Sequence, residues 1–426
     1  MSLISVVLAA GVGALLVATS VAPVSTTEPT DVTSSYLIEA ATSASTADVT
    51  EIVEDAGGDV TETLTEVIEG VSAELSEEQA AELLDSPDVA AIYEHQPLQL
   101  TETQTDAPWG LSRIDQVALP VDSSYTYPSS AGAGIPVYVV DTGVSANATQ
   151  YQTRLLPGRN FAADRAIGTD TSDCQGHGSH VAGIVGSTTY GVAKSATIVP
   201  VRVFECNGYG DTNALFGALD WIATQPIGVV NLSLSVTTGT FAPLDDAVTA
   251  LVNAGYVVVV AAGNNNGLNA CNYSPGSAPS VLTVGATTST DQRASYSNIG
   301  PCIDLFAPGS LITSLSHTSS TAAEVKSGTS MATPHVAGAA AVLWAMNSTS
   351  SSAAIQGQVV DYAVTNVIGS AGAGSPNRLL NIGHTGSGGG VALPARLADT
   401  RPGNATIDGI TQGVGAVGPG QTLRVP

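Results

Sequence analysis

The chain has 426 residues, of which 43% are hydrophobic and 12% charged, and its formal net charge is −25. This length allows two or three domains with a full hydrophobic core, which excludes a peptide hormone or a small disulfide scaffold, and the apolar fraction excludes a wholly disordered protein. The acidic balance argues against a nucleic-acid partner, because phosphate binding requires a basic surface.

The first 22 residues form an apolar stretch that ends in small residues. This pattern predicts a secretory signal peptide at 1–22 and a secreted protein, although no Lys or Arg precedes the apolar run. An uncleaved membrane anchor is the alternative, since the run approaches the length that spans a bilayer. No second run of that length occurs, so we expect no stable membrane insertion once the signal is removed.

Residues 36–95 predict a small α+β unit that carries most of the negative charge. Residues 23–100 hold 18 acidic residues and no Lys or Arg. YLIEA predicts a strand, ADVTEIVEDAGG a helix, TLTEVIEGVSAEL strand material and VAAIYEH a final strand. A second helix is expected after Ser76, which with Gln79 resembles a capping box.

Residues 105–382 predict a larger α/β domain with a mostly parallel central sheet and helices on both faces. Its apolar runs are β-branched and nearly continuous, and helix-like stretches separate several of them. A Gly- and Ser-rich linker follows at 383–390, and residues 391–426 form a C-terminal extension of unknown role that is too short for its own core. The apolar runs are IPVYVVDTG, ATIVPVRVF, IGVVNLSLS, GYVVVVAAGN, SVLTVGAT and CIDLFAPG.

Four polar residues of the larger domain lie beside predicted strand ends or helix starts, where reactive groups of parallel-sheet proteins collect. A serine hydroxyl becomes nucleophilic when an imidazole takes its proton, a carboxylate orients that imidazole, and an amide can stabilise an oxyanion. These residue types predict acyl transfer. The candidates are Asp141 in VYVVDTG, His177 in DCQGHGSHVAG, Asn264 in VVVVAAGNNNG and Ser330 in SGTSMATPHVAG.

The segments DTG, GHGSHVAG, AAGN and GTSMATPHVAG, in this order, resemble the subtilisin-like serine proteases, and APWGLSRIDQ, TYGVAK and SPNRLL resemble the proteinase K branch of that family. The resemblance covers about residues 105–382, and 36–95 resembles the family's inhibitory prosegment. It implies a subtilisin-like three-layer α/β fold and a secreted serine endopeptidase. The enzyme would be a self-processed zymogen, cleaved between Leu100 and Gln104, that acts on peptide or protein substrates and is inhibited by its own prosegment. We expect a monomer.

Two other classes of function stay open at this point. A secreted scaffold could bind peptides in the same cleft without catalysis, and an organophosphorus probe for reactive serines would not label it. An esterase or lipase is the second alternative. Those enzymes usually carry their serine in GxSxG, whereas residues 328–332 lack the second glycine.

The resemblance also implies the residues that bind substrate. Segment 208–210 matches an edge that pairs with a bound peptide strand, 233–235 matches the opposing edge, and 261–263 matches the wall of the primary specificity pocket. The family usually has two glycines where this chain has Ser235 and Val236, so the expected preference for large apolar or aromatic residues depends on how these side chains narrow the pocket. The implied residues are Gly208, Tyr209, Gly210, Ser233, Leu234, Ser235, Ala261, Ala262 and Gly263.

The four cysteines allow three pairings, and their spacing alone does not choose among them. The resemblance implies the disulfides Cys174–Cys206 and Cys271–Cys302. It also implies one or two structural calcium sites and no organic cofactor, with an ordinary solvated surface as the alternative for these acids. The first site would use Asp304 with the carbonyls of Pro279 and Val281. The second would use Asp115, Gln116, Asp122 and Ser124, where Ser112 replaces an acid of the family.

Overall fold

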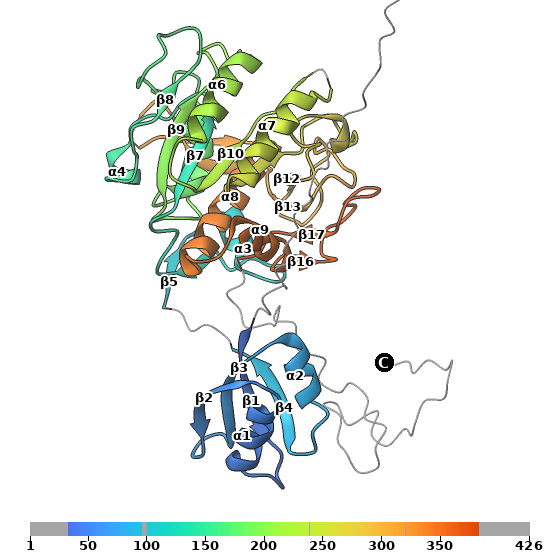
Figure 1. The fold of residues 1–426 in the computed structure, drawn as a ribbon. Coiled ribbons are helices and arrows are strands. Elements are labelled where there is room, and N and C mark those ends of the chain that lie inside the picture. Colours follow the sequence, from blue (N-terminus) through green and yellow to red (C-terminus); the bar gives the residue numbers. More distant parts are fainter. Residues whose placement is uncertain (1–32, 96–99, 238, 320, 383–426) are drawn as a thin grey trace, which may run out of the picture. The chain divides into compact units, whose positions relative to one another are not determined.

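The computed structural model describes residues 33–95, 100–237, 239–319 and 321–382 (Figure 1). They fall into two compact units, which divide between residues 96 and 97. The predicted signal peptide, the 383–390 linker and the 391–426 extension lie outside the described residues. No helix in the described ranges is both long and apolar enough to cross a bilayer.

The smaller unit is a four-stranded antiparallel sheet with two helices. The sheet order is β2-β3-β1-β4, and Val49, Val53, Ala80 and Leu83 of the helices pack against it. The capping box of Ser76 and Gln79 is confirmed, whereas residues 65–69, expected to be strand material, form the bend between two strands. The elements are β1 (Ser34–Ala40), α1 (Thr46–Asp55), β2 (Asp59–Leu64), β3 (Gly70–Leu75), α2 (Glu77–Leu83) and β4 (Val89–Glu94).

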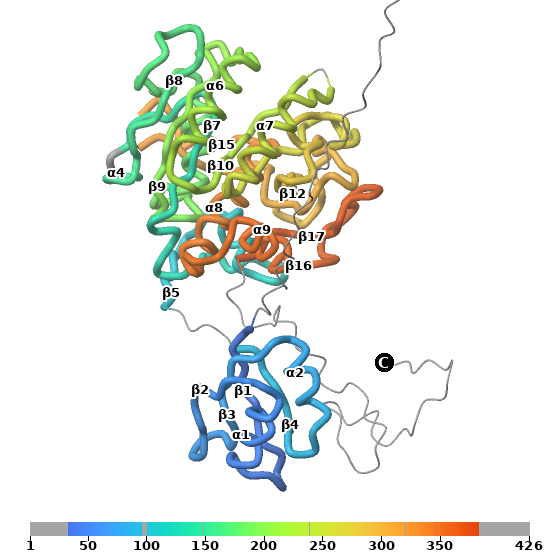
Figure 2. The backbone as a smooth tube through the Cα atoms, viewed as in Figure 1, coloured from blue at the N-terminus to red at the C-terminus, as the bar shows by residue number. Residues whose placement is uncertain are grey.

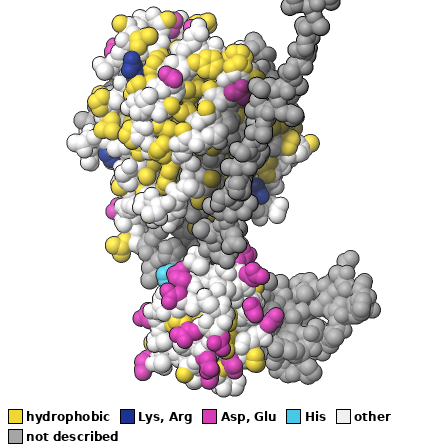
Figure 3. All heavy atoms as spheres, viewed as in Figure 1, with side chains coloured by type: hydrophobic (Ala, Val, Ile, Leu, Met, Phe, Trp, Pro, Cys, Tyr) yellow, Lys and Arg dark blue, Asp and Glu magenta, His cyan; other side chains and the backbone are white. Residues whose placement is uncertain are grey.

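Acidic side chains are spread over the visible face of the smaller unit, and few charged side chains are visible on the larger one (Figure 3). This distribution matches the absence of Lys and Arg from residues 33–95. The smaller unit therefore carries a net negative charge without any Lys or Arg to offset it.

The larger unit contains a nine-stranded sheet of order β16-β17-β13-β12-β11-β10-β7-β9-β8, parallel except for β16 against β17. Its strands are β7 (Pro136–Asp141), β8 (Arg159–Asn160), β9 (Thr197–Arg202), β10 (Val229–Leu232), β11 (Val257–Ala261), β12 (Leu282–Thr287), β13 (Leu305–Pro308), β16 (Val364–Thr365) and β17 (Arg378–Leu379). Its helices are α3 (Trp109–Ile114), α4 (Ala148–Tyr151), α5 (His177–Gly186), α6 (Thr212–Ile222), α7 (Ala242–Asn253), α8 (Thr329–Met346) and α9 (Ser352–Asp361).

The strands separate two hydrophobic cores because successive side chains of a strand point to opposite faces. Val137 and Val139 of β7 belong to the core that contains residues of α5, α8 and α9. Tyr138 and Val140 of the same strand belong to the core that contains residues of α6 and α7. The predicted three-layer α/β architecture is thus confirmed, and the backbone path can be followed in Figure 2.

The direction in which the chain winds across the sheet reverses at β7. From β7 the chain passes through α5 to β9 on one side, and then through α6 to β10 on the other side of β7. Where the direction of winding changes in this way, the loops at the carboxyl ends of the strands diverge and leave room for a ligand.

Two pairs of strands outside the main sheet were not expected from the sequence. β5 (Thr101–Thr105) pairs antiparallel with β6 (Ser124–Pro128), and β14 (Ile312–Leu315) pairs antiparallel with β15 (Ala323–Lys326). The β14–β15 hairpin packs against α5. His180 of α5 contacts it through Nε2, which lies 3.0 Å from the carbonyl oxygens of both Ile312 and Glu324.

Candidate active site

Asp141, the last residue of β7, and His177, the first residue of α5, form a hydrogen-bonded pair. His177 Nδ1 lies 2.8 and 2.9 Å from the two carboxylate oxygens of Asp141. The Asp141 side chain is 1% exposed and that of His177 28% exposed. The buried carboxylate therefore orients the imidazole through one nitrogen and leaves Nε2 free to exchange protons.

The surroundings of His177 make it a stronger base than an ordinary histidine. Burial opposes the charged imidazolium, but the negative charge and the hydrogen bond of Asp141 outweigh burial and raise the pKa of His177. The ammonium of Lys326, on β15, partly counteracts this rise in pKa, and the carboxylate of Asp173 adds to it.

Three side chains cap the start of α5. Gly176 precedes the helix with a φ of +101°, which favours glycine, and has no side chain to act as a cap. The N–H groups of the first three helical residues donate instead to Gln175 Oε1 at 2.9 Å, Thr142 Oγ1 at 2.8 Å and Asp173 Oδ2 at 2.9 Å. The N-terminal end of α5, which carries His177, is therefore held by hydrogen bonds to three different side chains. This role of Thr142 and Asp173 was not predicted, although the two residues lie within the quoted segments VYVVDTG and DCQGHGSHVAG.

Ser330 lies in the first turn of α8, beside the end of β10. Its Oγ donates to the Ser233 carbonyl oxygen at 3.2 Å, and Ser233 Oγ donates to the Ser330 carbonyl oxygen at 3.0 Å. No hydrogen bond joins Ser330 Oγ to His177 in this arrangement, as is common before a substrate binds. Packing of α5 against α8 brings Ser330 to the same edge of the sheet as the Asp141–His177 pair.

Asn264, three residues beyond β11, is oriented by the start of α8. Its Oδ1 accepts hydrogen bonds from Thr329 N at 2.9 Å and Thr329 Oγ1 at 3.1 Å. This fixes the amide so that Nδ2 is the free group, and the side chain is exposed. Nδ2 is thus available as a donor next to Ser330.

The three segments expected to bind substrate follow β9, β10 and β11 at this same edge, and β7, which carries Asp141, lies between β9 and β10. Segment 208–210 follows β9, 233–235 follows β10, and 261–263 begins at the last residue of β11. Tyr209 is 61% exposed, whereas Ala261 and Ala262 are buried. Gly263 has a φ of +95°, and a Cβ there would lie 2.6 Å from Asn298 Nδ2, so a side chain does not fit.

The departure from the family pattern also lies at this edge. Ser233 is 5% exposed, and Leu234, Ser235 and Val236 are half-buried. The backbone N–H of Val236 donates to the Ser274 carbonyl oxygen at 2.8 Å. The backbone N–H of Val236 is therefore already hydrogen-bonded to a neighbouring loop.

Two disulfides join Cys174 to Cys206 and Cys271 to Cys302, the pairing that the resemblance implies. The first ties the loop before His177 to the loop before segment 208–210. Nearby, the buried Arg202 guanidinium binds both oxygens of Asp164 at 2.6 and 2.7 Å and lowers the pKa of that carboxyl to about 2. Asp164 and both of these cysteines lie close together, but a disulfide offers no thiolate to a metal.

One predicted calcium site contains a buried oxygen without a partner. Asp115 is 7% exposed; its Oδ2 accepts from Thr126 N at 2.6 Å, and its Oδ1 has no hydrogen-bond partner. Burial, with a contribution from the charge of Asp122, raises the pKa of Asp115 to about 6. Asp122 Oδ1 in turn accepts from Ser124 Oγ at 2.7 Å. Two carboxylates, one with an unsatisfied buried oxygen, fit a hard divalent cation.

At the other predicted calcium site, Asp304 Oδ2 accepts a hydrogen bond from Thr283 N at 2.7 Å. Burial raises the pKa of Asp304 to about 6. Val281 immediately precedes β12, which places its backbone near this carboxylate, whereas Pro279 is exposed. This site offers one carboxylate and therefore relies more on carbonyl oxygens than the Asp115 site.

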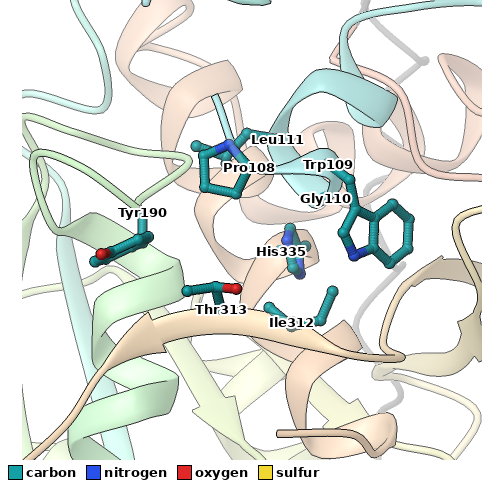
Figure 4. A pocket seen from close by; sticks show the side chains of 8 residues that line it. All are labelled: Pro108, Trp109, Gly110, Leu111, Tyr190, Ile312, Thr313 and His335. Atoms are coloured by element: carbon teal, nitrogen blue, oxygen red, sulfur yellow. The ribbon is translucent and has the colours of Figure 1, made fainter. Parts of the chain in front are cut away.

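A small hollow beside α3 is lined by none of the predicted catalytic or calcium-binding residues (Figure 4). Its lining includes Trp109, Tyr190, Ile312 and His335, the last from α8. Burial lowers the pKa of His335 to about 4, and its Nδ1 contacts the Met331 carbonyl oxygen at 2.8 Å. His335 is thus a neutral structural group, as expected for a histidine on an apolar helix face.

Comparisons with known proteins give a family match for each of the two units. The sequence model described as "Subtilase family" matches residues 132–387, and that described as "Peptidase inhibitor I9" matches residues 21–101. The chain is 47% identical over 311 residues to "Extracellular serine proteinase" of Thermus sp. (strain Rt41A), covering 73% of this chain and 75% of the relative. It is 38% identical over 314 residues to "Proteinase R" of Parengyodontium album, covering 72% and 78%. A solved structure of "a cold adapted subtilisin-like serine proteinase" has 43% sequence identity and a TM-score of 0.61, covering 65% of this chain and 98% of that one.

Proposed function

The chain belongs to the subtilase family and is a serine protease with an I9 prosegment, and on that basis we propose a secreted, monomeric endopeptidase that forms an acyl-enzyme on Ser330. The observation that carries this proposal is the hydrogen bond between the buried Asp141 and the half-buried His177, at the sheet edge where Ser330 lies in the first turn of α8. An extracellular location agrees with the name of the Thermus relative.

In the proposed reaction, Ser330 Oγ attacks the carbonyl carbon of the scissile bond while His177 Nε2 takes its proton. Asp141 stabilises the imidazolium that forms. Asn264 Nδ2 and the Ser330 backbone N–H donate to the oxyanion of the tetrahedral intermediate. The intermediate collapses when His177 gives the proton to the leaving amine, and the same steps with water release the acyl group.

The substrate would bind as an extended strand between segments 208–210 and 233–235. Backbone groups at such edges pair with any peptide, which supports broad specificity. Ala261 and Ala262 offer an apolar wall without a charged group, which supports a preference for large apolar or aromatic residues. The half-buried Ser235 and Val236 would restrict the size of the residue accepted.

Labelling with an organophosphorus reagent tests the proposed nucleophile. Wild-type enzyme is expected to take up one equivalent on the peptide that contains Ser330, since an activated serine reacts and an ordinary one does not. Ser330→Ala is expected to take up none, whereas Ser327→Ala, three residues away, retains full labelling. Absence of label from folded wild-type protein would favour the non-catalytic scaffold.

The boundaries predicted from the sequence divide the proposed zymogen into successive segments. We propose a signal peptide at 1–22, an inhibitory prosegment at 36–95 and the peptidase at 105–382, with a 383–390 linker and the 391–426 extension after it. Cleavage was expected between Leu100 and Gln104. Because β5 (Thr101–Thr105) is paired with β6 inside the larger unit, we favour the start of this range, which leaves most of the strand intact.

Loss of the proposed oxyanion donor has a separate kinetic signature. Asn264→Ala is expected to lower kcat by about 10²–10³ while KM changes little, because the donor acts mainly in the transition state. Asn266→Gly is the matched control, since Asn266 is also exposed and its φ of +55° suits glycine. Equal kcat values for Asn264→Ala and the control would remove Asn264 from the mechanism.

We further propose structural calcium at the Asp115 site, with the Asp304 site as a second candidate. Asp115, Gln116, Asp122 and Ser124 would bind the ion through their oxygens, and it would offset the repulsion between the two carboxylates. The ion would stabilise the fold and take no part in bond cleavage.

Calcium removal is expected to lower the Tm of Ser330→Ala protein, and Asp115→Asn is expected to abolish most of this calcium dependence. Calorimetry with and without a chelator measures both effects. Asp170→Asn, which removes an exposed carboxylate elsewhere, is expected to retain the dependence in full. A calcium-dependent Tm that survives in Asp115→Asn would move the ion to the Asp304 site.

A further inference from the structure

A second buried carboxylate, that of Asp173, lies beside the Asp141–His177 pair. Its side chain is 8% exposed, and no Lys or Arg of the described ranges forms an ion pair with it. Burial of an unpaired charge is costly unless hydrogen bonds compensate, and here five donors do so. They are Thr142 Oγ1 at 2.9 Å, Gln175 N at 2.9 Å, Gly176 N at 2.8 Å, Ser179 N at 2.9 Å and Ser179 Oγ at 2.7 Å.

These donors come from both halves of the pair. Thr142 directly follows Asp141, and its N–H donates to Asp141 Oδ1 at 2.7 Å. The other donors belong to the loop and first helical turn that carry His177. The Thr142 hydroxyl also accepts from the N–H of Gly178 at 2.8 Å, so it bridges the two halves next to Asp173.

We propose that Asp173 is a positioning residue of the proteolytic reaction, holding the end of β7 and the start of α5 together so that Asp141 meets His177 Nδ1. This inference rests on the proposed function of Ser330 and His177. Asp173 is buried behind the pair and acts through it, without contact with substrate.

The charge of Asp173 provides a readout that packing alone would not. Its carboxylate favours the imidazolium and so contributes to the raised pKa of His177. Removal of this charge should therefore lower the pKa of His177 and move the acid limb of kcat/KM to lower pH. The other titratable or charged groups near His177 stay in place: Asp141 on β7, His180 on α5, His317 against Gly176, and Lys326 on β15.

The decisive variant is Asp173→Asn, which keeps the size of the side chain but loses the charge and turns an NH₂ group toward backbone donors. We expect kcat per active site to fall by about 10- to 100-fold, because small misplacements of an acid–base pair are costly, with KM near the wild-type value. Asp170→Asn is the matched control: this aspartate lies on the same loop, is 62% exposed, and pairs with Arg165 at 3.1 Å. It should retain kcat within about twofold and the wild-type pH profile.

Two further measurements cover a variant that folds or matures poorly. NMR titration of His177 in the Ser330→Ala background, with Asp173→Asn or Asp170→Asn added, reports the pKa without any catalysis. Thr142→Val removes the hydroxyl bridge but keeps the charge, so it should lower kcat and leave the acid limb in place.

The proposal is overturned if Asp173→Asn shows wild-type kcat per active site, or only fewer active sites with an unchanged pH profile. It is equally overturned if the His177 titration does not move, or if Thr142→Val keeps wild-type kcat when Asp173→Asn cannot be isolated. Failure of the proposed function looks different, because Ser330→Ala would then retain activity whatever residue 173 is.

Discussion

Ser330→Ala is expected to lower kcat by about 10⁶ and to leave the prosegment covalently attached. Loss of the nucleophile removes the acyl-enzyme route, and the remaining triad members then contribute little, because the three groups act as a unit. If processing is intramolecular, the bond at the start of β5 stays uncut. Peptide hydrolysis and N-terminal sequencing of wild type and variant, expressed side by side, measure both effects.

The wild-type protein should begin near Thr101–Thr105, and the variant should begin where the signal peptide ends. Ser327→Ala, with a hydroxyl that accepts a hydrogen bond from Leu311 N at 2.8 Å, should mature as wild type does. A variant that matures normally in a strain free of other proteases would show that Ser330 does not process its own chain.

Asp291→Asn is expected to cost about 3–5 kcal/mol of stability, because it leaves a fully buried guanidinium without its counter-charge. Arg113 on α3 is 0% exposed, and its Nε and Nη2 lie 2.8 and 3.0 Å from the two Asp291 oxygens. Asparagine tolerates the φ of +54° at this position, so the loss reports the charge and not the backbone.

Thermal unfolding of Ser330→Ala protein, which cannot digest itself, should show a Tm lower by on the order of 10 °C for Asp291→Asn. Asp170→Asn breaks the Arg165–Asp170 pair, whose side chains are 25% and 62% exposed, and should cost about 0–1 kcal/mol. If the two substitutions lowered Tm equally, the remaining hydrogen bonds of Arg113 to the Gln116 and Val117 carbonyl oxygens would be sufficient to stabilise the guanidinium.

The two substitutions test different levels of the same molecule. Ser330→Ala removes the proposed nucleophile and should leave the fold unchanged. Asp291→Asn should weaken the attachment of α3, the helix next to the proposed calcium site at Asp115, to the loop after β12. Ser330→Ala should lose activity and keep its stability. Asp291→Asn should lose stability and keep its activity at moderate temperature. This contrast would distinguish a residue that acts in the reaction from one that supports the fold.

Local patterns predicted the parts of the fold whose causes are local. Continuous β-branched runs are typical of strands covered on both faces, and β7, β10, β11 and β12 lie within such runs. The Ser76–Gln79 capping box likewise depends on residues three apart. Elements with weak local signals were missed: β14 and β15 have only four residues each, and neither strand alternates buried with exposed residues.

In the candidate site, too, some features could be predicted from the sequence and others could not. Residue types and their neighbours were enough to single out Asp141, His177, Asn264 and Ser330, because a nucleophile, base, orienting acid and oxyanion donor need particular functional groups. The sequence could not reveal that Asp173 would accept five hydrogen bonds, or that Arg113 would pair with a residue 178 positions away. Such contacts depend on which loops meet after the sheet has formed.

What the amino-acid order determined alone is the alternation of strands and helices, the likeness to subtilisin-like proteases, and the choice of candidate reactive residues. These follow from side-chain chemistry and short-range periodicity, which each segment carries within itself. Only the tertiary structure decided how Asp141 meets His177, which side chains replace the missing cap at Gly176, and which buried oxygen of Asp115 lacks a partner. Those outcomes depend on distances between segments far apart in the chain, and packing of the whole domain sets them.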